Sequence, residues 1–331
     1  MLDTLITGGH LLTMAGLGVG FVEDGAVGIR GRRIVAVGPR RELEAHGPAT
    51  MTLDARDRLV MPGLIDAHMH SAAVLGRGWA QEVEKWMDSA YGPMLRNADP
   101  ADAPLATLWA LMEGVANGTT TFADYTRPMG ELVKSHALVG SRGVVCDSIS
   151  ERNFANREQW IAQGWKPGDP TPLDAEAGKA SLERSLRLHE EWDGHDEGRI
   201  RVIFGPHAAD FLSKDMLLRV QAEARKRGCR LHLHVAQDPR ENTATQQRFG
   251  LRAIPYLASI GLLAPDLIAV HLSTATEAEV ETVVKSGAGM VCCANSIGII
   301  DGVMPPAALF KRLGGRVALG SDQAPGNNSH N

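Results

Sequence analysis

The sequence has 331 residues, of which 44% are hydrophobic, and a formal net charge of −5. This length suffices for one large domain with a small appendage, and the negative charge offers no basic surface for nucleic acid. There is no apolar run of about 18 residues and no basic start followed by an apolar stretch, so the sequence predicts neither a membrane span nor a signal peptide. The four cysteines form no C-x-x-C pair. We therefore expect buried free thiols in a reducing cytoplasm.

Residues 1–60 have the pattern of short strands joined by glycine turns. Candidate strands cover residues 2–12, 25–30 and 33–37, and Gly-Arg-Arg at 31–33 predicts a hairpin turn. From residue 61 the pattern changes to strand, loop and helix in alternation. We therefore expect two domains, residues 1–60 and residues 61–331.

The second domain contains eight candidate strands alternating with helical periods. The strands are residues 64–67, 119–123, 143–146, 201–204, 230–235, 267–270, 289–294 and 316–320. The clearest helical periods are residues 103–116, 173–192, 214–227 and 275–285. This alternation predicts an α/β fold, a parallel (β/α)8 TIM-type barrel. A doubly wound sheet would need a glycine-rich turn after the first strand, and His-Met-His-Ser-Ala-Ala is not one.

The first barrel strand leads into a pair of histidines. Residues 61–70 read Met-Pro-Gly-Leu-Ile-Asp-Ala-His-Met-His. Strand side chains alternate between faces, so His68 and His70 point the same way. Two neutral imidazoles on one face can share a metal ion. The sequence thus predicts a metal site at the end of this strand.

Four further expected strands also end in titratable residues. These residues are His207 after the fourth strand, His234 in the fifth, His271 after the sixth and Asp322 after the eighth. Active sites of such barrels lie at the carboxyl ends of the strands, so we expect these side chains to converge. His232 points inward by the same alternation but one layer deeper, and we interpret it as a packing residue.

Taken in order, these motifs resemble the amidohydrolase superfamily, in particular its deaminase and triazine-hydrolase branch. The resemblance implies that residues 1–60 form the first half of a small β-sandwich, whose second half follows the barrel. The chain ends soon after its eighth strand, without the expected last helix, so we expect a fragment of a longer protein. The resemblance also implies a small-molecule substrate, and we expect a homodimer for the full-length protein. From the charge and the apolar pattern, we expect no nucleic acid or membrane partner.

The resemblance assigns roles to single residues. His68, His70, His234 and Asp322 match the ligands of one divalent metal ion, zinc foremost, with iron(II), manganese or cobalt as alternatives. His271 matches a histidine that contacts the metal-bound water, and Asp322 accepts the proton of that water. Residues 201–207 contain no lysine to bridge a second metal, which favours a single ion.

Other residues match the substrate pocket of the same branch. His207 follows a proline where the branch has a histidine that touches substrate, although it could instead cap the following loop. Trp86, within Glu-Lys-Trp-Met at 84–87, matches a loop over the site. Asn295 matches a loop after the seventh strand that lines the pocket. We therefore predict that His207, Trp86 and Asn295 bind substrate.

One departure from the branch bears on the reaction. The branch has His-x-x-Glu after the fifth strand, and here the residues are His234-Val235-Ala236-Gln237. Gln237 cannot ionise, so it cannot shuttle a proton to an aromatic ring nitrogen, but it can orient substrate. Our leading hypothesis is hydrolysis of a C–N, amide, urea, carbamate or thiocarbamate bond in a small non-peptide molecule. The alternatives are a purine, pterin or triazine deaminase and a catalytically weak protein that binds metal and ligand only.

Overall fold

The computed structural model describes residues 1–16, 18–84, 86–153, 156–166 and 169–330. The chain divides into two compact units, Met1–Leu64 and Ile65–Asn331. Lys85 of the tryptophan-containing loop lies outside the described residues. Within the described residues, no helix combines the length and apolarity needed to cross a membrane. The four cysteines are free and buried, as predicted.

The smaller unit is a five-stranded sheet. Its four-strand path runs β3-β2-β1-β4, with β5 paired to β1. Arg30 lies opposite Arg33 in the antiparallel pair of β2 and β3, so Gly31 and Arg32 form the predicted turn. Gly31 has a φ of +56°, a conformation that glycine adopts without steric cost. The elements are β1 Thr4–Leu12, β2 Phe21–Arg30, β3 Arg33–Pro39, α1 Arg40–Glu44, β4 Met51–Asp54 and β5 Leu59–Val60.

All eight strands expected in the larger unit are present. Their bounds are β6 Leu64–Met69, β7 Thr119–Tyr125, β8 Arg142–Cys146, β10 Ile200–Val202, β12 Leu231–Val235, β13 Leu267–His271, β14 Gly289–Cys292 and β15 Val317–Leu319. The fourth strand is shorter than predicted, because Phe204 pairs only through a single bridge to Leu231. The seventh ends at Cys292, because helix α12 already begins at Ala294.

These strands form two four-stranded sheets whose edges meet. One sheet has the order β10-β8-β7-β6 and the other β12-β13-β14-β15. Parallel bridges between Phe204 and Leu231, and between Met69 and Asp322, connect the sheet edges on both sides. The eight strands therefore close into a ring, which is consistent with a TIM barrel and not with a doubly wound sheet.

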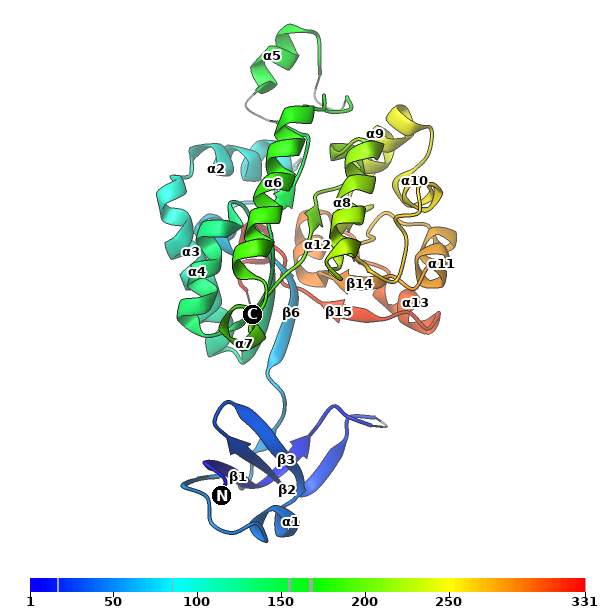
Figure 1. The fold of residues 1–331 in the computed structure, drawn as a ribbon. Helices are drawn as coiled ribbons and strands as arrows, with labels where there is room; N and C mark the ends of the chain where they lie inside the picture. Colours follow the sequence, from blue (N-terminus) through cyan, green and yellow to red (C-terminus); the bar gives the residue numbers. More distant parts are fainter. Residues whose placement is uncertain (17, 85, 154–155, 167–168, 331) are drawn as a thin grey trace. The chain divides into compact units, whose positions relative to one another are not determined.

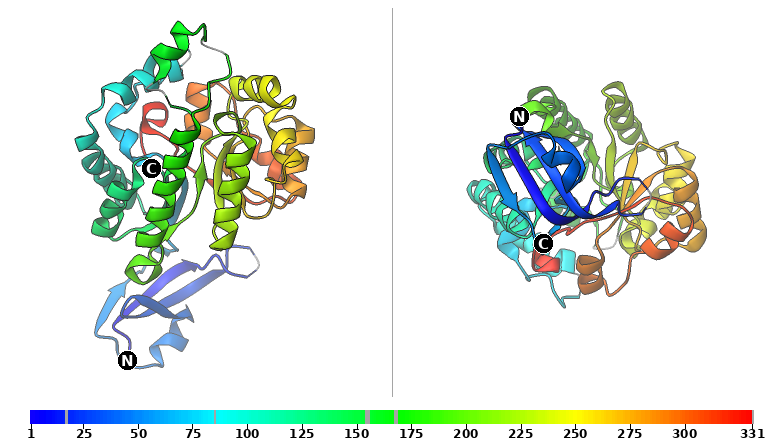
Figure 2. Two further views of the ribbon diagram at one scale, coloured as in Figure 1. Left: turned by 45° about the horizontal axis from the view of Figure 1, so that its top comes forward. Right: turned by 90° about the horizontal axis from the view of Figure 1, so that it is seen from below.

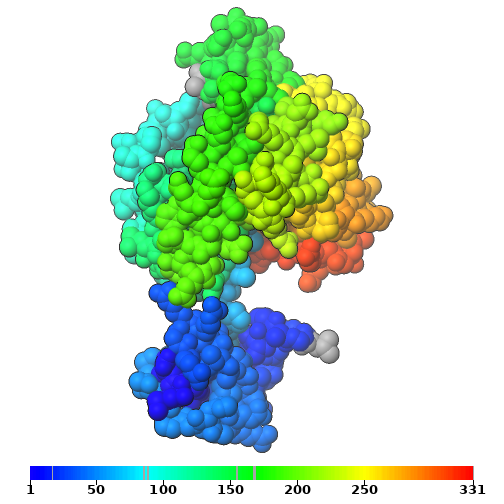
Figure 3. Space-filling view, in the orientation of Figure 1, coloured from blue at the N-terminus to red at the C-terminus, as the bar shows by residue number. Residues whose placement is uncertain are grey.

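Helices surround this ring (Figure 1). Among them, α6 and α8 lie side by side in both ribbon figures (Figure 2), and in the space-filling view they form the middle of the visible face of the larger unit (Figure 3). The longer helices are α3 Ala103–Ala116, α4 Met129–Val139, α6 Ala175–Trp192, α8 Lys214–Lys226, α9 Pro239–Phe249, α10 Ala253–Ser259 and α11 Glu277–Lys285.

Shorter segments fill the loops between strands and helices. They are η1 Ser71–Gly76, η2 Met87–Tyr91, α2 Gly92–Asn97, η3 Pro100–Asp102, β9 Ser148–Ile149, α5 Arg157–Ala162, α7 His195–Gly198, β11 Gly205–Pro206, η5 Ala209–Phe211, α12 Ala294–Ile300, α13 Ala307–Arg312 and α14 Ala324–Asn327.

Local sequence signals explain where several helices begin. Thr276 and Glu279 form a capping box at the start of α11, in which each side chain binds the other residue's backbone N–H. Asp238 caps α9 by accepting a hydrogen bond from the Glu241 N–H at 2.9 Å. These caps fix the loops that follow β12 and β13, the strands that carry His234 and His271.

Candidate metal centre and active site

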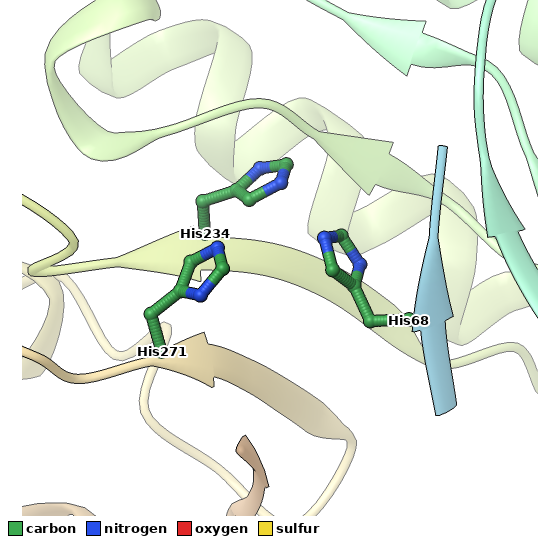
Figure 4. Close-up of side chains that lie close together, drawn as sticks. All are labelled: His68, His234 and His271. Atoms are coloured by element: carbon green, nitrogen blue, oxygen red, sulfur yellow. The ribbon is translucent and has the colours of Figure 1, made fainter. Parts of the chain in front are cut away.

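The structure brings the predicted metal ligands together at the carboxyl ends of three strands. His68 lies in β6, His70 follows it directly, His234 lies in β12, and Asp322 follows β15. The rings of His68, His234 and His271 point toward one another (Figure 4). Two groups of side chains each place their potential ligand atoms within 4.8 Å of one another: His68, His234 and His271, and His68, His70 and Asp322.

Asp322 lies between the two histidines of the first strand. Its Oδ1 atom is 3.5 Å from Nε2 of His68 and 3.5 Å from Nε2 of His70. Its Oδ2 atom accepts a hydrogen bond of 2.7 Å from the Ser296 hydroxyl, which fixes the carboxylate. Asp322 and His271 have φ values of +65° and +79°, so the chain turns sharply where each side chain is presented.

The ring nitrogens of the cluster have the properties of metal ligands. Nε2 of His68 and both ring nitrogens of His271 are buried and form no hydrogen bond within the described residues. Burial, together with the neighbouring histidines, holds the pKa of His68 and His234 well below the usual range, and burial lowers the pKa of His271 to about 4. The imidazoles are therefore neutral at pH 7, the form that binds metals.

The ring nitrogens on the far side of the cluster are held by neighbouring groups. Nδ1 of His234 donates to the His207 carbonyl at 2.8 Å, and Nδ1 of His70 donates to the Tyr125 carbonyl. Nδ1 of His68 lies 2.9 Å from Nε2 of His232. Such contacts fix the tautomer and orientation of histidine ligands. The interpretation of His232 as a packing residue was therefore wrong, because its ring contacts a proposed ligand directly.

Asp66 joins the strand of the two histidines to the segment before Asp322. Its Oδ1 atom accepts hydrogen bonds from the His68 N–H at 3.2 Å and the Ser321 N–H at 3.0 Å. Its Oδ2 atom accepts from the Ser321 hydroxyl at 2.5 Å. We did not predict this role, although strand alternation places Asp66 on the same face as His68 and His70.

A cavity of about 250 Å³ opens beside the cluster. His70, His207, His234, His271, Asp322 and Gln237 all line it. Trp86 also lines it and is 8% exposed, and its indole N–H donates to Asp301 at 2.9 Å. That bond connects the loop after β6 with α12. Three of the residues predicted to bind substrate, His207, Trp86 and Gln237, thus lie at the cavity.

His207 hydrogen-bonds Ser148 and does not cap the loop that follows it, although its ring packs on Phe211 in that loop. Its Nδ1 atom lies 2.9 Å from the Ser148 hydroxyl, and the 3₁₀ segment η5 after it has no side-chain cap. The loop-capping alternative is therefore not observed. Burial, followed by the charges of Arg127 and other nearby groups, keeps the pKa of His207 well below its usual range.

Asn295 does not line the cavity. It is exposed and hydrogen-bonds Asn327, whereas its neighbour Ser296 is buried and binds Asp322. The predicted position is one residue away from the side chain that reaches the site, because α12 turns successive residues in different directions. The sequence contained no signal for this difference.

Gln237 occupies the position at which the His-x-x-Glu motif has its glutamate. Its backbone N–H donates to Oε2 of Glu241 at 3.0 Å, and its side chain forms no hydrogen bond within the described part of the chain. Glu241 is buried and does not line the cavity, and burial raises its pKa to about 8. Among the described residues that line the cavity, Asp322 is the only carboxylate.

Residues 59–331 match the family model described as the amidohydrolase family. The chain therefore belongs to this family, and its predicted class, a hydrolase of carbon–nitrogen bonds other than peptide bonds, is confirmed. It is 27% identical to the 5'-deoxyadenosine deaminase of Methanosarcina barkeri over 332 residues, which cover 99% of this chain and 71% of that protein. It is 32% identical to a 5-methylthioadenosine/S-adenosylhomocysteine deaminase of Nitratidesulfovibrio vulgaris, covering 94% of this chain and 66% of that protein.

Solved structures show the same fold. An adenosine deaminase from Xanthomonas campestris with bound zinc superposes with a TM-score of 0.86 at 25% identity, covering 99% of this chain and 71% of that one. Atrazine chlorohydrolase TrzN from Arthrobacter aurescens TC1, complexed with zinc, superposes with a TM-score of 0.84 at 18% identity, covering 99% of this chain and 74% of that one. The neighbours that carry zinc support a divalent metal in this fold.

Proposed function

We propose that this chain hydrolyses a C–N or related bond, of an amide, urea, carbamate or thiocarbamate, in a small non-peptide molecule. The observation that carries the proposal is the cluster of four histidines, His68, His70, His234 and His271, with Asp322 beside a cavity wall that bears Gln237. His68, His70, His234 and Asp322 would hold one divalent ion, with zinc the first choice. Such an ion supplies hydroxide at neutral pH and polarises the substrate carbonyl.

Three residues at the site would transfer protons and bind substrate. His271 is neutral, buried and at the cavity wall, so it can first accept the proton released by the attacking water and then pass that proton to the leaving amine or thiol. Asp322, fixed by Ser296, can accept a proton at Oδ1, the oxygen that faces the two histidines. Gln237 also lines the cavity and offers an amide that can hydrogen-bond substrate.

The second candidate is deamination of a purine, pterin or triazine ring. The relatives named as deaminases favour it. The cavity argues against it, because ring deamination by the usual route needs a residue that carries a proton to the ring nitrogen. Among the described lining residues, Gln237 cannot do so and there is no carboxylate besides Asp322. Neither nearby carboxyl group lines the cavity: Asp238 caps α9, and Glu241 accepts a hydrogen bond from the Gln237 backbone N–H.

Three further proposals concern the barrel, the N-terminal sheet and the cellular setting. We propose that the ring of strands is a (β/α)8 barrel and that the N-terminal sheet is part of a β-sandwich. The four buried free thiols support a reducing, cytoplasmic setting.

Product analysis on the full chain, reconstituted separately with zinc, manganese, cobalt and iron(II), tests the proposal. The panel contains anilides, phenylureas, carbamates and thiocarbamates on one side, and adenosine-type purines, pterins and aminotriazines on the other. We expect amine or thiol release from the first set. Ammonia release confined to the second set would establish the deaminase, and metal binding without turnover of either set would contradict both.

A further inference from the structure

Four arginines line the cavity beside the histidine cluster: Arg96, Arg127, Arg152 and Arg157. The single carboxylate among the described lining residues, Asp322, already faces His68 and His70 and accepts from Ser296. Among the described lining residues, guanidinium groups therefore outnumber carboxylates, and the one further carboxylate on which Arg152 is seen to act, Asp210, lies outside the lining. This excess is unusual for a pocket that receives a neutral molecule.

The arginines reach the cavity from several separate elements. Arg127 follows β7 by two residues, and Arg152 follows β9 by three. Both thus leave carboxyl ends of strands, as the histidines do. Arg96 lies in α2, and Arg157 begins α5. Since one solvated helix face cannot produce this convergence, the tertiary fold itself gathers the charge.

Two of these arginines, Arg127 and Arg152, act on His207, whose ring packs on that of the proposed ligand His234. Arg152 stacks on Phe211 with 4.2 Å between its guanidinium carbon and the ring centre. The Phe211 ring is 5.1 Å from that of His207, which in turn is 5.0 Å from that of His234. The positive charges of Arg127 and Arg152 both lower the pKa of His207, after the larger effect of burial.

Arg240 is a further arginine at the same aromatic ring, and it has a carboxylate partner. It lies 4.9 Å over Phe211 and pairs with the buried carboxylate of Asp210. In the described residues no carboxylate lies within ion-pair distance of Arg96 or Arg127. A guanidinium at a partly enclosed site gains most from a bidentate oxyanion.

We propose that the substrate carries an anionic oxygen group, a carboxylate or a phosphate, which Arg127 and Arg152 bind while the scissile bond lies at His271 and Asp322. This inference rests on the proposed hydrolase function and narrows its substrate class. The neutral side chain of Gln237 fits the same picture, because a glutamate there would repel an anionic substrate.

Binding of matched small probes to the zinc-loaded full chain tests the inference without turnover. Calorimetry is performed with benzoate, phenylphosphonate and the neutral analogue benzamide, at low and at raised salt. The variants are Arg127→Gln and Arg152→Gln. The control is Arg312→Gln at the end of α13, an exposed arginine outside the cavity.

We expect at least one anion to bind more tightly than benzamide, and to bind about 10-fold more weakly in each cavity variant, with a smaller difference at raised salt. Benzamide binding and the control variant should be unaffected. Loss confined to benzoate or to phenylphosphonate identifies the carboxylate or the phosphate class. Equal anion affinity in the wild type and both cavity variants would overturn the inference, because anion binding to the metal alone would be independent of the arginines. A chain that binds anions in this way but turns over no substrate would contradict only the hydrolase proposal.

Discussion

Replacing Asp66 tests whether the metal ligands depend on a contact between two strands. β6 and β15 share no regular ladder, and a single bridge between Met69 and Asp322 connects them. The Asp66 carboxylate accepts two hydrogen bonds across this junction, from the Ser321 N–H and the Ser321 hydroxyl, and a third from the His68 N–H within its own strand. Asp66→Ala should therefore loosen both His68 and Asp322.

The size of the effect follows from the groups left unpaired. Asp66→Ala orphans two backbone N–H groups, each at a cost of about 1–3 kcal/mol, whereas the Ser321 hydroxyl keeps its contact of 2.9 Å with His330. The free energy of unfolding should fall by roughly 2–6 kcal/mol, and metal affinity by about 10–100-fold because the ligands lose a supporting contact.

Asp66→Asn separates these two effects. Its carbonyl oxygen can replace Oδ1, which accepts from both backbone N–H groups. Its amide can donate to the Ser321 hydroxyl, which then donates to His330. We expect this variant to fold with a loss below about 1.5 kcal/mol and to bind metal less than about 10-fold more weakly than the wild type.

Metal affinity is measured by competition with a chromophoric chelator, and stability by urea unfolding of the metal-free chain. Asp99→Ala is the control, because Asp99 caps a short exposed helix through one bond of 2.9 Å to the Ala101 N–H and lies outside the site. It should cost about 1 kcal/mol and leave metal binding unchanged. If Asp66→Ala binds zinc as tightly as the wild type, the junction does not position the ligands.

The remaining predictions concern the site and its pH dependence. His234→Ala should abolish metal retention, as measured by elemental analysis. The control is His195→Ala, which changes an exposed histidine on α7 and should leave metal retention intact. Full metal occupancy in His234→Ala would exclude His234 as a ligand. On an amide, urea or carbamate substrate, His271→Ala should lower kcat by about 10²–10⁴-fold and Gln237→Glu should lower it less, because only His271 protonates the leaving group; a faster Gln237→Glu beside a silent His271→Ala would reverse these roles. Burial raises the pKa of Glu241 to about 8, so Glu241 is protonated in the folded chain at a pH where it ionises in the unfolded chain. Its contribution to the free energy of unfolding is therefore greatest below the unfolded pKa near 4.5 and is lost as the pH rises to 8. Relative to the wild type, Glu241→Gln should gain roughly 2 kcal/mol or more between pH 5 and pH 8 in urea unfolding, and parallel pH profiles would show that Glu241 is ionised in the fold.

Strand alternation and strand ends were enough to predict most of the site. His68 and His70 share a face because they are two residues apart in one strand, and this rule is local. The eight strands were recognisable from short apolar runs between helical periods, and parallel strands place their carboxyl ends at one edge. Hence His234, His271 and Asp322 could be brought to the same site before their distances were known.

Contacts between strands distant in the sequence were decided only by the tertiary structure. The bond from His232 to His68, the role of Asp66 at Ser321 and the choice of Ser296 over Asn295 all depend on how segments are staggered against one another. A one-residue difference in that stagger exchanges the side chains that meet, and no local pattern encodes it. The arginines of the cavity are a further case, because they come from four elements that only the closed ring of strands brings together.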